Sequence, residues 1–230
     1  MNADERVWGG TTLDARRQSR RERLLEVGFE LLGGPDGAAA VTVRSVCRHA
    51  KLTDRYFYES FADREELLVA VYDRVGAEAR EVLTDAVRAA VSGPATPEAL
   101  ARAAVLAFLG LLTGDPRKGR VLLLAPMSDP TLSARALALQ PAFAELVRVQ
   151  LACTDDPGTG MAEAGGGPGP DELAQRLTAF ALIGALTQLF VRWVDGSLAV
   201  AADELTEYCV RLLTHAAHLA RPPPPDPGRS

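Results

Sequence analysis

Apolar residues recur every three or four positions along most of the chain, which is the spacing of one face of an α-helix. The first such stretch covers residues 14–32, ends at a pair of glycines and is followed by a predicted loop. Two short stretches come after Thr42 and Thr53. A long one opens at Asp63, where Glu66 completes a capping pattern. Since no stretch alternates like a half-buried strand, the pattern predicts an all-α fold of about nine helices.

The later helices are predicted to begin where proline follows a residue that can cap a helix. The three starts are at Pro97, Pro116 and Pro130. The second of these helices is expected to end before Pro126, because proline has no N–H to donate within a helix. Two further helices are predicted at about residues 171–195 and 203–220, and the first of them is apolar on nearly every side.

Three segments carry no helical pattern: residues 1–12, the Gly-rich segment 154–170 and the Pro-rich tail 221–230. Their composition predicts disorder at the two ends and a flexible insertion between them. The remaining chain divides into an N-terminal three-helix domain, residues 13–62, and a C-terminal helical bundle, residues 63–220, which contains the insertion.

The 230-residue chain carries 25 Lys and Arg against 30 Asp and Glu, and its net charge of -5 at first argues against nucleic acid. The charge is uneven, because the residues up to Arg64 are close to balance and the later ones are acidic. Between residues 16 and 25 one glutamate stands among five arginines: Arg16, Arg17, Arg20, Arg21 and Arg23. This strip is either a phosphate-binding surface or an ordinary solvated helix face, and both interpretations stay open.

The cysteines and the apolar runs indicate the compartment. The three cysteines are far apart, with neither disulfide nor zinc spacing, which predicts a reducing environment. The N-terminus lacks the apolar run of a secretory signal, and the longest apolar stretch, Ala179 to Val191, is shorter than a membrane span. These features predict a cytoplasmic protein.

Two very short helices joined by a tight turn, with longer helices on both sides, describe a helix-turn-helix motif. The second short helix is predicted over residues 54–60. Phe57 and Phe61 lie four residues apart and are expected to face the core. The outward face is left with polar and aromatic residues: Arg55, Tyr56, Tyr58 and Ser60. Such side chains bind phosphates and base edges, so the motif predicts DNA binding.

The residues around this motif resemble the DNA-binding signature of the TetR/AcrR family of transcriptional regulators, over about residues 14–75. The resemblance is carried by three runs: Val41-Thr42-Val43-Arg44, Ala50-Lys51-Leu52-Thr53, and Tyr58-x-x-Phe61-x-Asp63-Arg64-Glu65-Glu66-Leu67-Leu68. It implies an all-helical homodimer in which three N-terminal helices recognise DNA and a variable C-terminal bundle binds a small molecule.

The resemblance also implies which side chains contact DNA: Arg16, Arg17, Arg20, Thr42, Arg44, Thr53, Arg55, Tyr56, Tyr58, Ser60 and Arg64. Tyr58 matches a tyrosine that touches the DNA backbone, and Arg64 stands where a lysine usually binds phosphate. Two positions depart from the family pattern. Lys51 replaces the glycine usual in the turn, and Arg55 replaces a small residue, which implies an unusual operator sequence.

Polar residues among aromatic ones in the later helices predict a pocket for an apolar or amphipathic effector. Its expected lining is Phe108, Met127, Gln140, Phe143, Gln188, Arg192 and Trp193. The same polar residues would also suit a dimer interface or a satisfied place in the core. No cofactor or metal is expected, because His215 and His218 lie three apart with no third ligand beside them.

The sequence therefore predicts a ligand-responsive transcriptional regulator, a repressor that a small-molecule effector releases from a palindromic operator. Dimerisation is expected through residues 171–195 and 203–220, because the first is apolar on more sides than one bundle can cover. No set of nucleophile, base and acid indicates an enzyme. Two other classes stay open: a helical enzyme or carrier that keeps the motif only for packing, and an architectural DNA binder without an effector.

Overall fold

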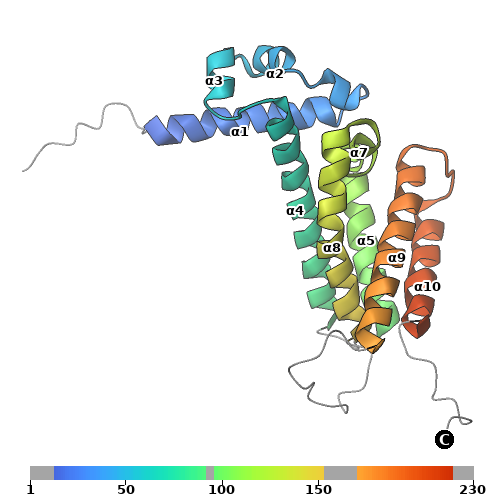
Figure 1. Ribbon diagram of the computed structural model, residues 1–230. Helices are drawn as coiled ribbons and strands as arrows, with labels where there is room; N and C mark the ends of the chain where they lie inside the picture. The colour runs from blue at the N-terminus through green and yellow to red at the C-terminus, as the bar shows by residue number, and fades with distance from the viewer. Residues whose placement is uncertain (1–12, 92–95, 153–169, 220–230) are drawn as a thin grey trace, which may run out of the picture.

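The computed structural model describes residues 13–91, 96–152 and 170–219, which form helices and the turns between them (Figure 1). In chain order the elements are α1 (Leu13–Leu32), η1 (Gly37–Ala40), α2 (Val43–Ala50), α3 (Asp54–Tyr58), α4 (Arg64–Val91), α5 (Pro97–Gly114), α6 (Pro116–Gly119), η2 (Arg120–Leu124), α7 (Ala125–Ser128), α8 (Pro130–Ala152), α9 (Pro170–Val194) and α10 (Ala202–Leu219). Because α6, η2 and α7 run on without a break, the described residues hold nine helices besides the 3-10 turn η1, which confirms the all-α prediction.

The predictions for residues 1–12 and 221–230 lie outside the described residues, as does the predicted insertion 154–170 except for Pro170, which begins α9.

The helices form two parts that share α4 (Figure 1). α1, α2 and α3 make a cap across one end of a bundle built from α4, α5, α8, α9 and α10. α4 packs against α1 and, further along, lies beside α5 and α8. α9 and α10 pack on each other at the side of the bundle away from α4.

Thr42 sets the start of the first short helix of the motif. Its hydroxyl accepts a hydrogen bond from the Ser45 N–H at 3.1 Å, and the Ser45 hydroxyl accepts one from the Thr42 N–H at 2.9 Å. This reciprocal cap and the buried side chains of Val46 and Ala50 hold α2 in place, as the sequence predicts. Lys51 ends the helix in the left-handed region, with φ 56° and ψ 39°.

Phe57 and Phe61 are both buried, with ring centroids 5.9 Å apart, as expected. They belong to an apolar core that also takes residues from α1, α2 and the first turns of α4. This first core extends into the bundle, because Val121, Ala125 and Leu132 from η2, α7 and α8 are part of it. The helix-turn-helix is therefore fixed to the bundle by a shared core.

Two elements differ from the prediction. The segment after α1, expected to be a loop, contains the short helical turn η1. The helix expected to end before Pro126 continues through it as α7. The π-helical turn η2 comes directly before α7 and changes the hydrogen-bond register. Pro126 follows this turn with Ala125 between them, so the change of register falls where proline has no N–H to donate.

A second apolar core lies between α5, α9 and α10, around Val105, Phe190 and Cys209. Two described helices are long and apolar enough to cross a membrane by length and composition alone, over Pro97–Gly114 and Glu172–Val194. The second of these is α9, at the place where the sequence predicts a helix over about residues 171–195. Both helices pack against other helices of the bundle, although α9 leaves apolar side chains exposed.

Replacing Lys51 by glycine is expected to stabilise the protein by about 0.5–1 kcal/mol, because a Cβ in the left-handed region is strained and glycine has none. Lys51→Ala keeps the Cβ and the strain, so it is the matched control. Urea unfolding of the three proteins measures the difference. A glycine variant no more stable than the alanine variant would show that this turn stores no strain.

Candidate nucleic-acid interface and ligand cavity

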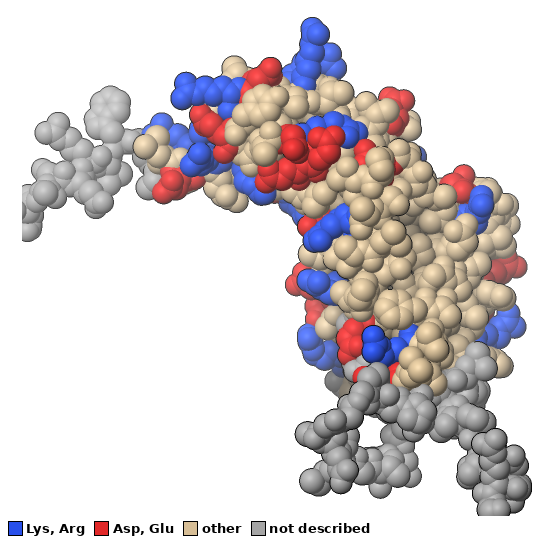
Figure 2. Space-filling model, in the orientation of Figure 1, with Lys and Arg blue, Asp and Glu red and all other residues tan. Residues whose placement is uncertain are grey.

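The outer side of the helix-turn-helix carries polar side chains at the start of α2 and along α3. Three of the predicted contacts at the helix starts are exposed: Thr42, Arg44 and Thr53. On α3 the Arg55 side chain is 84% exposed and Tyr58 is 59% exposed, while Phe57 between them is fully buried. Figure 2 shows Lys and Arg gathered over this end of the molecule, mixed with Asp and Glu. The structure thus brings these predicted residues to one end of the protein.

Arg20 lies on α1, but its side chain is engaged with α3. Its guanidinium lies 4.5 Å from the centre of the Tyr56 ring and 3.6 Å from the Glu59 carboxylate. Glu59 also accepts a hydrogen bond from Arg55 at 3.1 Å. Arg20 therefore holds α3 against α1. The other two predicted contacts on α1 are exposed: Arg16 and Arg17.

Ser60 does not face outward as the sequence suggested. α3 ends at Tyr58, two residues earlier than predicted, and the Ser60 hydroxyl donates to the Tyr56 carbonyl at 3.1 Å. The side chain is half-buried. Ser60 closes the turn that leads from α3 towards α4.

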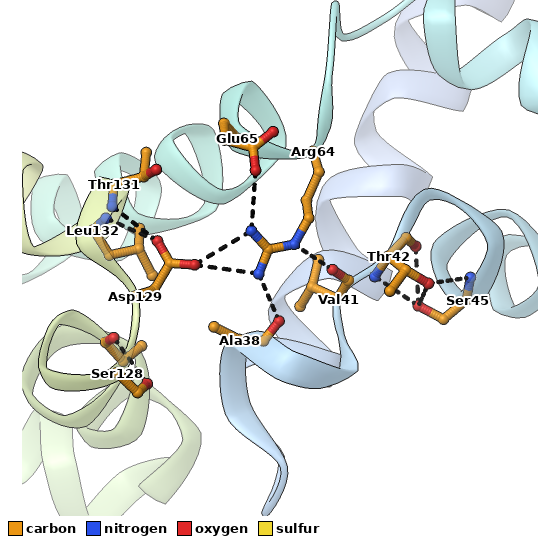
Figure 3. A network of polar contacts seen from close by, with 11 residues as sticks. Ala38, Val41, Thr42, Ser45, Arg64, Glu65, Ser128, Asp129, Thr131 and Leu132 are labelled. Atoms are coloured by element: carbon orange, nitrogen blue, oxygen red, sulfur yellow. Dashed lines mark hydrogen bonds and ion pairs between the residues drawn. The ribbon is translucent and has the colours of Figure 1, made fainter.

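Arg64, expected to bind phosphate, is instead bound within the protein (Figure 3). Its Nε donates to the Val41 carbonyl at 2.6 Å, and Nη2 donates to the Ala38 carbonyl at 2.8 Å. Nη1 and Nη2 donate to the Asp129 carboxylate at 3.3 and 3.2 Å, and Nη1 also donates to Glu65 at 3.2 Å. The sequence does not reveal this contact, because Asp129 lies 65 positions away and reaches Arg64 only through the packing of α8 on α4.

A cavity of about 430 Å³ opens inside the bundle, between α4, α5, η2, α8, α9 and α10. This volume lies within the range of small-molecule sites, about 300–1,000 Å³. The walls are mainly apolar, with a few polar side chains among them: Thr84, Arg88, Gln140, Glu145 and Thr187. Three of the predicted pocket residues line it: Phe108, Gln140 and Phe143.

The other four predicted pocket residues lie elsewhere. Met127 is exposed on α7, and Gln188 and Arg192 are exposed on α9. Trp193 packs against the second core, and its Nε1 donates to the Val200 carbonyl at 3.1 Å. The reason is helical phase: neighbouring residues on a helix point about 100° apart, so Thr187 faces the cavity while Gln188 does not.

Sequence reasoning missed the wall that α4 contributes. Tyr72, Leu83 and Val87 all line the cavity. The signal was available, because the apolar spacing of α4 continues beyond Val75 to these later positions. The sequence placed this helix in the bundle, residues 63–220, but did not indicate which of its faces lines the cavity.

Burial raises the pKa of three titratable groups near these sites. Tyr72 lines the cavity and belongs to the first core, and burial raises the pKa of its hydroxyl to about 12. Burial likewise raises the pKa of the Cys47 and Cys209 thiols to about 11. All three groups are therefore protonated at neutral pH.

Within the described ranges, no group of three His, Cys, Asp or Glu is placed to hold a metal ion. Nδ1 of His215 lies 2.8 Å from the Arg211 carbonyl oxygen. The side chain of His218 lies outside the described part of the chain.

Comparison with known proteins identifies the fold. No family model and no curated protein matches the chain. A transcriptional regulator from Pseudomonas aeruginosa PAO1 matches with a TM-score of 0.65 and 18% identity, over 90% of this chain and 97% of that one. FadR from Bacillus subtilis, in complex with stearoyl-CoA, matches with a TM-score of 0.63 and 16% identity, over 85% and 98%.

A TetR-like transcriptional regulator from Rhodococcus sp. RHA1 also matches, with a TM-score of 0.60 and 18% identity, over 86% of this chain and 96% of that one. At these identities the likeness shows the fold. The chain has the all-helical fold of the TetR-like transcriptional regulators, as its residues 14–75 led us to expect.

Filling the cavity is expected to abolish the binding of an apolar dye. Ala104 on α5 lines the cavity, so Ala104→Trp places a large side chain in it, while Leu106→Trp adds the same side chain to an exposed position of that helix. Fluorescence of anilinonaphthalene sulfonate on titration with each folded protein is the measurement. The dye should bind the wild type and Leu106→Trp. Equal binding by Ala104→Trp would show that the dye does not occupy this cavity.

Proposed function

We propose that the protein is a ligand-responsive transcriptional regulator that binds DNA through α2 and α3. The observation that carries the proposal is the division of α3 into two faces. Phe57 is held in the core, while Arg55 and Tyr58 stand out from the opposite face. An arginine and a tyrosine in such a place bind phosphates and base edges in a major groove. The likeness of the fold to TetR-like regulators supports this function. We propose with it that the protein acts in the cytoplasm and is not an enzyme.

We assign residues 13–62 to DNA binding and residues 63–220 to effector binding and dimerisation. The exposed polar residues of α2 and α3 support the first assignment, and the cavity supports the second. The two units are not independent in this proposal, because the first core includes residues from both.

A homodimer through α9 and α10 is supported by the apolar face that α9 exposes. Leu173, Leu177 and Phe180 follow one another along this face and are 50%, 61% and 42% exposed. At Gly184, one turn further, no described atom lies within 4 Å of where a Cβ would be, so a second helix has room to approach closely. Figure 2 shows a broad uncharged area over this side of the bundle. A two-fold partner would bury such an area on both copies.

The lining of the cavity supports an apolar or amphipathic effector. Aliphatic and aromatic side chains would surround the apolar part, and the few polar side chains, Arg88 and Gln140 among them, would bind a polar group. FadR from Bacillus subtilis, one of the similar structures, contains stearoyl-CoA. An effector of this class is what we propose for the present cavity.

The proposed mechanism is repression that the effector relieves. In a two-fold dimer the two copies of α3 enter successive major grooves of a palindromic operator, about 34–36 Å apart. An effector that binds better to a conformer with another separation lowers DNA affinity by the ratio of its affinities for the two conformers. α4 and α8 line the cavity and also contribute to the first core, so they connect the two sites.

Arg55→Ala is expected to weaken operator binding by about 1–3 kcal/mol per half-site and to relax preference at one operator position, because an arginine at this place can pair with guanine. Tyr58→Phe is the comparison variant: it removes a hydroxyl that is expected to touch only the DNA backbone. Selection from a random DNA library gives the consensus for each protein. An unchanged consensus for Arg55→Ala would reduce Arg55 to a phosphate contact, and failure of the wild type to select any sequence would contradict the proposed function.

Phe180→Glu is expected to turn the dimer into a monomer, because it places a charge in the middle of the proposed apolar contact. Leu13→Glu is the control, because it places the same charge at an apolar residue of α1 that is 81% exposed and outside the proposed interface. Sedimentation equilibrium of both variants and the wild type gives the masses. A dimeric Phe180→Glu protein would exclude this face as the interface.

A further inference from the structure

The Arg64 guanidinium has no N–H left for a phosphate. An arginine side chain has five N–H groups, and five hydrogen bonds within the protein use them: one from Nε, two from Nη1 and two from Nη2. The side chain is only 26% exposed. Contact with DNA would require some of these bonds to break.

The acceptors of these hydrogen bonds come from three different segments (Figure 3). Ala38 belongs to η1, and Val41 directly precedes Thr42, the residue that caps α2. Asp129 lies between α7 and α8. Arg64 itself is the first residue of α4. One side chain therefore joins the start of the helix-turn-helix to the starts of α4 and α8.

Asp129 is itself held firmly. Its Oδ2 accepts from Arg64, while its Oδ1 accepts from the backbone N–H groups of Thr131 at 3.0 Å and Leu132 at 3.2 Å. The carboxylate thus caps α8 and is buried, with a side chain 8% exposed. A chain of hydrogen bonds thus runs from the start of α8 through Asp129 and Arg64 to the Val41 carbonyl, next to the start of α2.

We propose that Arg64 and Asp129 form a positioning joint that sets where α2 and α3 stand on the bundle, and hence the separation of the two copies of α3 in the dimer. This inference rests on the proposed function, since the separation matters only for a protein that binds two half-sites. It assigns Arg64 a role in spacing, in place of the phosphate contact expected from the sequence.

Asp129→Asn is the sharpest test of the joint. Asparagine keeps the shape and an oxygen that caps α8, but its NH₂ group cannot accept from Arg64. Arg64→Lys is the second variant, because the one nitrogen of an ammonium has three N–H groups and cannot replace the five that the planar guanidinium spreads over three nitrogens. Asp73→Asn is the matched control: it breaks the ion pair of Asp73 with Arg135, which joins α4 to α8 without touching η1 or α2.

The first readout is binding to a set of operators. One operator has its half-sites at the selected spacing, and in the others the half-sites lie one or two base pairs closer together or further apart. We expect Asp129→Asn and Arg64→Lys to reduce the preference for the selected spacing about threefold to tenfold, in the lower part of the range of coupling between contacting residues. The base consensus should stay the same, and Asp73→Asn should behave like the wild type. The joint would be overturned if Asp129→Asn kept the wild-type preference for spacing. It would also be overturned if this variant bound all DNA more tightly and with a steeper salt dependence, because Arg64 would then have been released onto phosphate.

Amide hydrogen exchange without DNA is the second readout. Exchange of the segment from η1 to the start of α2 should speed up in Asp129→Asn and stay at the wild-type rate in Asp73→Asn. Wild-type rates in Asp129→Asn would overturn the joint even if the protein binds its operator. If the wild type fails to bind any DNA sequence, the proposed function fails by itself, and the exchange rates still decide whether the two residues hold α2 in place.

Discussion

A continuous apolar core joins the helix-turn-helix to the bundle, and the rest of the structure depends on it. Phe61 of the motif and Leu67 of α4 are buried in the same cluster as Val121 and Leu132, which belong to η2 and α8. Neither part closes this core by itself, because each contributes residues that the other covers. The orientation of α2 and α3 is therefore tied to the packing of α4, α7 and α8, and Tyr72, which belongs to this core and lines the cavity, connects both sites.

The charged residues around the motif serve two purposes. Arg20 and Arg64 hold elements together, the first between α1 and α3 and the second between α2, α4 and α8. Arg44 and Arg55 stay exposed, as the proposed contact with DNA requires, although Arg55 also pairs with Glu59. Burying the ion pair of Arg64 with Asp129 costs desolvation energy that its attraction offsets only in part, so its contribution lies more in fixing one arrangement than in stability.

α9 presents apolar side chains both to the cavity and to the outside of the bundle, which a helix with one apolar face could not do. Ile183 and Leu186 face the cavity, whereas Leu177 and Phe180 are exposed on another side. This explains why the helix reads as apolar on nearly every side in the sequence. The inward residues shape the proposed effector site, and the outward ones make the proposed dimer contact, so an occupant of the cavity lies one helix away from the partner subunit.

The sequence by itself predicted most of the helices, the cap at Thr42 and the burial of Phe57 and Phe61, because each follows from residues within a few positions of one another. It also indicated the TetR-like fold, which the similar structures bear out. The contact roles of the DNA-binding residues remain predictions.

Only the tertiary structure decided the partners of Arg20 and Arg64, and only it showed that Thr187, and not the predicted Gln188, lines the cavity. These outcomes depend on which helices become neighbours and on their rotation about their own axes. Periodicity along one helix shows that a face is apolar, but the residue that meets this face is chosen by packing between segments far apart in the chain.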